Sequence, residues 1–161
     1  MKTHFLFILL FSYLSVQAQL TVNNDPPNDS PIYLVNDILL GDGVQASNHV
    51  YQGDSIQIGF FDASASNLGL NSGIVMSTGD ISILDPNFVG FGDFINIDPP
   101  VSDPDLLDVA NSVPALIGQN FIVQDINDVA VLEFDFIPSS DTITFKYVFA
   151  SQEYFAFENS Q

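Results

Sequence analysis

Five aspartates in the second half of the chain have the residue type and spacing that calcium sites use. Asp103, Asp105 and Asp108 form one cluster, and Asp125 and Asp128 form a second. Calcium takes about six to eight oxygen ligands, so each cluster could supply part of its shell. The spacing is not that of an EF-hand. Counted from Asp103, the sixth position of this chain is not glycine and the twelfth is not glutamate. The alternative is that Asp103 or Asp105 caps a short helix while the other aspartates are solvated.

Glu153 is a further candidate calcium ligand. It follows a stretch in which every second residue is apolar, and Tyr154 and Phe155 come directly after it. A carboxylate beside aromatic rings needs a charged partner, a hydrogen bond or a metal ion. Glu153 is therefore interpreted either as a metal ligand or as an edge residue whose carboxylate reaches solvent.

Catalytic patterns are weak in this sequence. A Ser–His–acid triad would have to use His49, which lies in the alternating pattern typical of a strand, and the sequence has no Gly-x-Ser-x-Gly elbow. A glycosidase needs two carboxylates at a defined separation, and this chain has many acids but no tryptophan to stack on a sugar ring. We expect no enzymatic activity, with a secreted glycan-active hydrolase as the alternative.

The charge of the chain excludes several classes of partner. The 161 residues include 20 acidic and 2 basic residues, for a formal net charge of −18. A nucleic-acid-binding protein needs clustered Lys or Arg, and so does a basic face that binds anionic lipid. Without cysteine the chain forms neither disulfides nor thiolate zinc sites. The 47% hydrophobic content and 15 phenylalanines are enough for the core of one folded domain.

The first 18 residues have the pattern of a secretory signal peptide. Lys2 is the positive end, Phe5–Leu14 is the apolar region, and Val16–Ala18 has the small residues of a cleavage site. A membrane anchor is the alternative, but a spanning helix needs about 20 apolar residues and this run is about half as long. We therefore expect a secreted or surface-exposed protein with a signal peptide over 1–18, a short lead-in over 19–30, and one domain over 31–161.

The clearest predicted strands lie near the end of the chain. Apolar residues alternate with polar ones in Val129–Ile137 and again in Thr142–Phe149, with a short turn between them. This pattern predicts a β-hairpin with one buried face. In that hairpin Lys146 would lie opposite Glu133 or Asp135, a cross-strand pair worth about 0.2–1 kcal/mol.

The rest of the chain predicts short elements joined by Asp-, Gly- and Pro-rich turns. We expect an all-β fold, an antiparallel β-sandwich or jelly-roll-like arrangement with one or two short helices. Predicted strands cover 43–51, 55–61 and 73–77, a helix or strand covers 31–40 with Ser30 as N-cap, a helix of one or two turns covers 103–110, and a loop covers 85–102.

Three stretches resemble the choice-of-anchor L domain, namely Gly73–Gly79, Val131–Pro138 and Thr144–Tyr154. The third is the most specific, because it contains the unusual sequence Phe-Ala-Ser-Gln-Glu-Tyr. The resemblance covers the chain from about Pro31 to its end. It implies a module of secreted and surface proteins, common in Bacteroidetes-type bacteria and often placed before adhesive repeats and a sorting signal. It implies surface display and adhesion, and no known catalytic activity.

Two departures from the family pattern shape the expectations. Gln152 stands where the family usually has a second glutamate, and the family pattern continues beyond Gln161. We therefore expect an N-terminal fragment whose C-terminal part is missing and whose anchoring depends on that missing region. The predicted function is a non-catalytic binding or adhesion module with calcium as a candidate stabilising ion. Its expected partner is an extracellular glycan, a protein or another cell, and the further alternative is a structural spacer.

Overall fold

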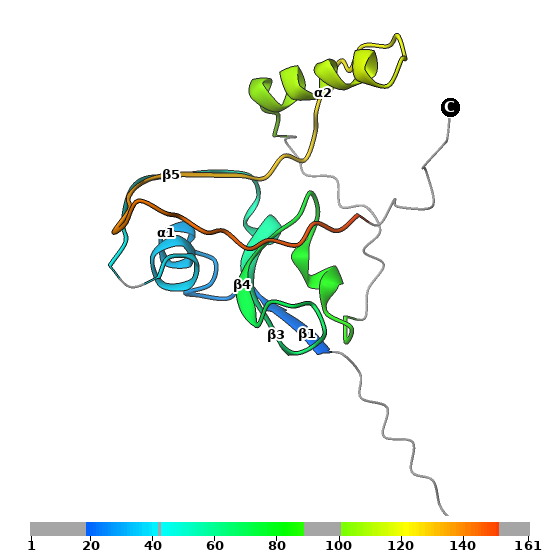
Figure 1. Ribbon diagram of the computed structural model, residues 1–161. Helices are drawn as coiled ribbons and strands as arrows, with labels where there is room; N and C mark the ends of the chain where they lie inside the picture. The colour runs from blue at the N-terminus through cyan, green and yellow to red at the C-terminus, as the bar shows by residue number, and fades with distance from the viewer. Residues whose placement is uncertain (1–18, 42, 89–100, 152–161) are drawn as a thin grey trace, which may run out of the picture.

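A computed structural model describes residues 19–41, 43–88 and 101–151 of the chain (Figure 1). Its strands form two antiparallel sheets, one with the order β1-β3-β4 and one with β2-β5. Short helices connect and flank these sheets. The predicted antiparallel β-structure with short helices is confirmed. Expectations for Glu153 and for the signal peptide over 1–18 lie outside the described residues.

The three-stranded sheet contains β1 (Gln19–Asn23), β3 (Ile58–Ala65) and β4 (Ser72–Met76). Its central strand β3 buries Ile58, Phe61 and Ala63, whose polar neighbours Asp62 and Ser64 face solvent. The predicted strands over 55–61 and 73–77 are thus confirmed, with shifted ends. The first starts later because Ser55–Gln57 form the 3₁₀-helix η2.

Gly59 lets three elements meet closely on this sheet. A Cβ atom at Gly59 would lie 2.7 Å from the backbone oxygen of Asn23 in β1. It would also lie 2.5 Å from the Cδ1 atom of Ile81, which is buried in the 3₁₀-helix η3 (Ile81–Leu84). Glycine is therefore required here by close packing.

The segment after Ser30 is helical. Pro31 occupies the first turn of α1 (Pro31–Tyr33), and the Ser30 hydroxyl accepts a hydrogen bond from the Tyr33 amide at 3.4 Å. The helix continues as the π-helix η1 (Leu34–Leu39), which packs against β3 and β4. Leu34 and Val35 are fully buried there and form the centre of the core together with Ile58 and Ile81.

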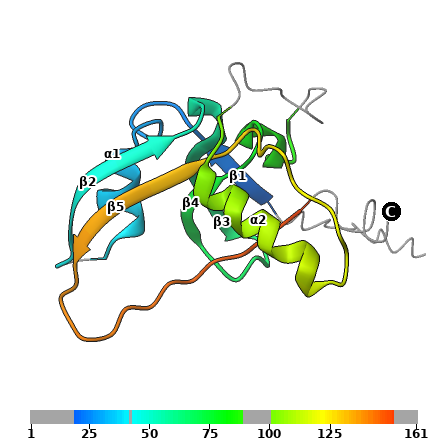
Figure 2. The same cartoon turned by 90° about the horizontal axis from the view of Figure 1, so that it is seen from above.

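The second sheet pairs strands that are far apart in sequence. In it β2 (Gln45–Gln52) runs antiparallel to β5 (Val131–Ile137), as Figure 2 shows. The register shifts between Ser47 and Val50, where Asn48 has a φ of 53°. The Asn48 side chain donates a hydrogen bond of 2.6 Å to the carboxylate of Asp135. This contact joins residues 87 positions apart in the chain.

The predicted hairpin is wrong in its pairing. The strand β5 pairs with β2, and residues 142–150 form an irregular segment that leaves the end of β5 (Figure 2). Glu133 therefore lies opposite Val50, and the expected cross-strand position of Lys146 does not arise. Pro138, which directly follows β5, has no amide hydrogen to continue a ladder. The turn after it is also longer than the two-residue turns that fix hairpin register best.

The helix α2 (Pro104–Leu116) extends beyond the predicted one or two turns. Asp103 is its N-cap, because its carboxylate accepts a hydrogen bond of 2.9 Å from the Leu106 amide. After the helix the chain turns back, and the Asn111 side chain holds the backbone of Val123 through two hydrogen bonds of 2.8 and 3.0 Å. Most of the predicted loop over 85–102 lies outside the described residues.

A buried glutamine connects the three-stranded sheet to the strand β5. Gln57 is fully buried, and its side-chain oxygen accepts a hydrogen bond of 2.7 Å from the Asp54 amide in a capping box. Its side-chain nitrogen donates a hydrogen bond of 2.9 Å to the backbone oxygen of Asp128. The next residue, Val129, is buried and leads into β5. Gln57 thus fixes the position of β5 relative to the core.

Candidate functional site

The described aspartates predicted to bind calcium lie along α2 and in the loop after it. Asp103 caps the helix, and Asp105 and Asp108 are exposed on its first turns. Asp125 is exposed in the loop, and Asp128 is half-buried with a φ of 58°. Within residues 19–41, 43–88 and 101–151 no group of three acidic or histidine side chains could hold a metal ion. The capping role of Asp103 is confirmed, and calcium binding stays a prediction.

His49 is a packing residue of the second sheet. Its ring stacks on Phe134 of β5 with a centroid distance of 6.3 Å and an interplanar angle of 22°. Phe134 in turn contacts Phe136 at 6.0 Å. The imidazole therefore continues a row of aromatic rings on one face of the sheet, which matches the strand position predicted for it.

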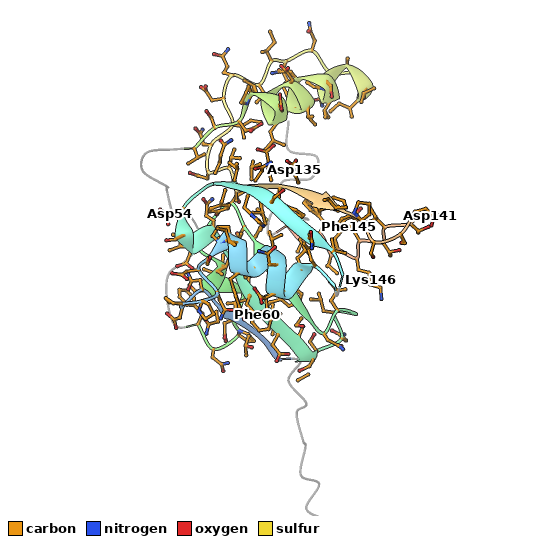
Figure 3. The ribbon with its side chains drawn as sticks, turned by 90° about the vertical axis from the view of Figure 1, so that its left-hand side faces the viewer. Asp54, Phe60, Asp135, Asp141, Phe145 and Lys146 are labelled. Carbon is orange, nitrogen blue, oxygen red and sulfur yellow. The ribbon has the colours of Figure 1, made fainter. Side chains whose placement is uncertain are left out.

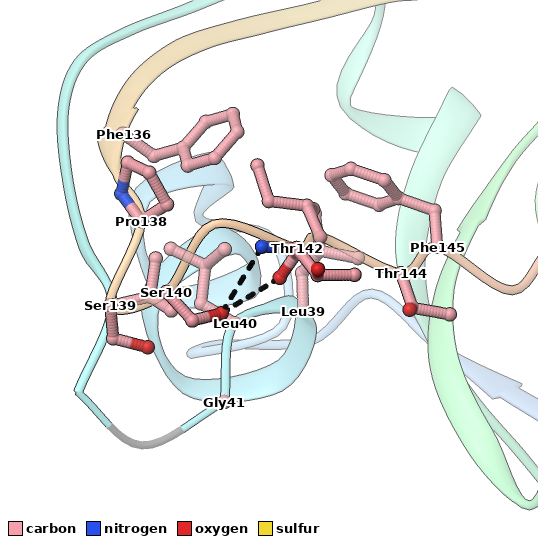
Figure 4. A pocket seen from close by; sticks show the side chains of 12 residues that line it. Leu39, Leu40, Gly41, Phe136, Pro138, Ser139, Ser140, Thr142, Thr144 and Phe145 are labelled. Carbon is pink, nitrogen blue, oxygen red and sulfur yellow. Dashed lines mark hydrogen bonds between the residues drawn. The ribbon is translucent and has the colours of Figure 1, made fainter.

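A small cleft lies at the end of the second sheet, beside the turn that follows β5 (Figure 4). It has a volume of about 180 Å³. Leu39 and Leu40 at the end of η1 form one side, and the rings of Phe136 and Phe145 form another, with their centroids 6.5 Å apart. Hydroxyl groups lie at the turn, where the Ser140 hydroxyl donates a hydrogen bond of 2.9 Å to the backbone oxygen of Thr142.

Large apolar side chains are exposed along the chain that leads away from this cleft. They comprise Ile137 at the end of β5 and Ile143, Phe145, Tyr147 and Phe149 in the segment after the turn, and we call these five residues the exposed band. Tyr147 and Phe149 are 85% and 86% exposed. The backbone groups from 143 to 150 make no hydrogen bond to the backbone of any other described residue. Contiguous exposed apolar surface of this kind marks interaction sites in folded proteins.

The sequence pattern that defines the Choice-of-anchor L domain matches residues 21–161. The match includes every element described above except the first residues of β1. The chain belongs to the choice-of-anchor L domain family. Comparisons with curated proteins and with solved structures gave no match. Family membership indicates a module of a surface or secreted protein.

Exposed charges of both signs lie on the strand and segment that form the cleft of this choice-of-anchor L domain. Asp135 on β5 and Asp141 in the turn are exposed, as is Lys146 in the following segment (Figure 3). The chain as a whole carries a formal charge of −18. A ligand that approaches the exposed band therefore meets a field that favours cations.

A second apolar surface lies on α2 of the choice-of-anchor L domain, where exposed residues follow helical spacing. They are Leu106, Val109, Val113, Leu116 and Ile117. None of these five residues is aromatic, which distinguishes this surface from the exposed band. Across the described residues, no helix combines the length and apolar character needed to cross a membrane.

Sequence reasoning missed the cleft of the choice-of-anchor L domain for a physical reason. Its described walls come from residues 39–41 with Val44 and from residues between Phe136 and Phe145, two parts of the chain that meet only in the fold. The exposed band did leave a signal, because every second residue of Thr142–Phe149 is apolar. The structure shows that this apolar face is open, whereas alternation alone predicted that it would be buried.

Proposed function

We propose that this choice-of-anchor L domain is a non-catalytic binding module, displayed at the cell surface or secreted, that contacts its partner through the cleft and the exposed band. The observation that carries the proposal is the exposure of Tyr147 and Phe149 beside an apolar cleft. Each Å² of apolar surface left in water costs about 25 cal/mol relative to burial. A partner that covers the band recovers this free energy, and aromatic side chains are the residues that most often dominate such contacts.

The positions of the described polar residues support a role without catalysis. The side chain of Asp103 caps a helix, and His49 stacks on Phe134. The described residues that line the cleft have aliphatic, aromatic and hydroxyl side chains, and none of them is an acid, a histidine or a lysine. Such a lining suits recognition of apolar groups better than proton transfer.

Adhesion assays test this proposal directly. The full chain, fluorescently labelled, is applied to glycan arrays, to immobilised extracellular proteins and to cells. We expect the double variant Tyr147→Ser with Phe149→Ser to lose binding by about tenfold or more, because it removes the two most exposed aromatic rings among the described residues. The matched control, Val109→Ser with Leu116→Ser on α2, should bind like the native chain.

Two results would contradict the proposal. Polysaccharide hydrolysis that is lost in Glu133→Gln would favour the glycan-active hydrolase. Failure to bind every glycan, protein and cell tested would favour a structural spacer.

Calcium stabilisation is retained as a separate prediction. The reason is electrostatic, because a divalent cation would relieve repulsion in a chain with a formal charge of −18. EDTA should lower the melting temperature of the full chain, and added Ca²⁺ but not Mg²⁺ should restore it. A melting curve unchanged by EDTA would contradict stabilisation by calcium.

A further inference from the structure

We propose that the cleft and the exposed band together form a strand-addition site for a cationic, extended segment of a partner protein. This inference rests on the proposed binding function and names the class of partner. It depends on three features, which are the backbone of residues 143–150, the size of the cleft and the net charge of the chain.

Among the described residues, the backbone of residues 143–150 has no backbone partner. These residues make no backbone hydrogen bond to another described residue, and they lie in an outstretched segment at the surface (Figure 2). Exposed backbone donors and acceptors are a template for an added strand. Ile143, Phe145, Tyr147 and Phe149 occur at every second position, which is the spacing at which one face of a strand presents its side chains. A partner strand would meet four large apolar side chains on that face.

The cleft has the size of one side chain. Sites for small molecules and cofactors are usually about 300–1,000 Å³ in volume. The cleft between Leu39, Leu40, Phe136 and Phe145 has about 180 Å³, so it is too small for most such ligands. It matches a single leucine, isoleucine or phenylalanine side chain projecting from an extended backbone. This favours a peptide strand over an oligosaccharide as the occupant.

The net charge of the chain favours a cationic partner. Asp141 and Lys146, which flank the cleft in sequence, are exposed and carry opposite charges, so the attraction comes from the chain as a whole, which carries a formal charge of −18. A second copy of the chain would carry the same charge, so electrostatic repulsion opposes pairing of two copies along this segment. Lysine or arginine residues on a partner strand would instead be attracted, most strongly at low ionic strength.

Peptide titration against the full chain tests the proposal. The probe is a peptide of about nine residues in which lysine alternates with valine and leucine, a typical strand length. The first control has the same sequence with every second backbone nitrogen methylated, which keeps the charge and blocks pairing. The second control replaces lysine with glutamate. By calorimetry the unmodified cationic peptide should bind at least about tenfold more tightly than either control, and about 0.5 M salt should weaken it.

A substitution in the chain locates the site. Tyr147→Pro removes one backbone donor from the band and should weaken binding of the cationic peptide by about tenfold. Tyr147→Phe keeps that donor and should bind normally. Equal melting curves for both variants establish that the fold is unchanged. The methylated peptide tests the need for backbone pairing without any change to the chain.

Three outcomes overturn the inference. These are equal binding of the methylated peptide, full binding by a folded Tyr147→Pro variant, and dimerisation of the chain through the band in sedimentation experiments. If the cationic peptide does not bind while adhesion still depends on Tyr147 and Phe149, the strand-addition proposal is wrong and the proposed binding function stands. If the adhesion assays fail as well, both proposals fall.

Discussion

The three-stranded sheet and the segment after β5 place their apolar side chains in opposite environments. Phe61 of β3 is 7% exposed and packs beside Gly73 of β4, whereas Phe149 of the exposed band is 86% exposed. The first region has paired strands and the buried Gln57 with both ends of its side chain hydrogen-bonded. In the second, residues 143–150 have no backbone partner among the described residues. This difference indicates that the first region stabilises the fold, and the second is the region for which we propose binding.

The same substitution in both regions gives the largest expected contrast. Phe61→Ala should lower the free energy of unfolding by about 3–5 kcal/mol, because it leaves a cavity between β3 and β4. Phe149→Ala removes a side chain that is already in water and should change the free energy of unfolding by about 0.5 kcal/mol or less. Urea denaturation followed by circular dichroism measures both. Equal losses for the two variants would show that the band is packed in solution.

The buried glutamine gives the next contrast. Gln57→Leu should lower the free energy of unfolding by about 1–3 kcal/mol. The reason is that the Asp54 amide loses its acceptor and the Asp128 carbonyl loses this donor inside the protein. Gln52→Leu, at an exposed position of β2, is the matched control and should be nearly neutral. Urea midpoints of the two variants provide the measurement. A neutral Gln57→Leu would mean that Gln57 does not hold β5 against the core.

A substitution at the start of α2 tests whether Asp103 acts as a helix cap or as a metal ligand. Asp103→Ala should lower the free energy of unfolding by about 0.5–2 kcal/mol, because the hydrogen bond from the Leu106 amide is lost. If Asp103 is only a cap, this loss is the same in EDTA and in millimolar calcium. Asp105→Ala, which changes an exposed side chain, is the control. A calcium-dependent loss at Asp103 would make it a ligand as well.

The smallest effect is a change of stability with alkaline pH. Burial raises the pKa of Tyr51 to about 12, with a further contribution from the charge of Asp54, and the Tyr51 hydroxyl donates a hydrogen bond to the Asp54 backbone oxygen at 2.9 Å. The fold therefore favours the neutral phenol. Its stabilising contribution is complete below the unfolded-state pKa of about 10 and is lost as pH rises towards 12.

Thermal melts at a series of alkaline pH values check this expectation. The difference in stability between the native chain and Tyr51→Phe should shrink above about pH 10. Tyr147→Phe, a change at an 85% exposed position, should leave the alkaline loss of the native chain in place. A difference that stays constant up to pH 12 would contradict the assignment to Tyr51.

Local patterns in the sequence predicted many of the elements but not their partners. Ser30 and Pro31 indicated the start of a helix where a strand was the alternative, and alternation indicated β3 and β5, because capping and side-chain period are properties of neighbouring residues. The pairing of β5 with β2 depends on contacts such as Asn48 to Asp135, which are 87 positions apart. No local pattern indicates that β5 should prefer this partner over the segment that follows it.

The candidate site was predictable to a smaller extent. The spacing of Ile143 to Phe149 indicated one apolar face, but the degree of exposure of that face depends on which strand takes the neighbouring position. Polar Gln57 would not be placed in a core by composition, because its burial depends on two hydrogen bonds formed only in the fold.

Amide hydrogen exchange on the full chain, with and without the cationic strand peptide, tests the division between the two regions most directly. The account predicts that amides of β3 exchange slowest, while those of residues 143–150 exchange rapidly in the free chain and become protected when the peptide binds. Protection of residues 143–150 equal to that of β3 in the free chain would contradict it.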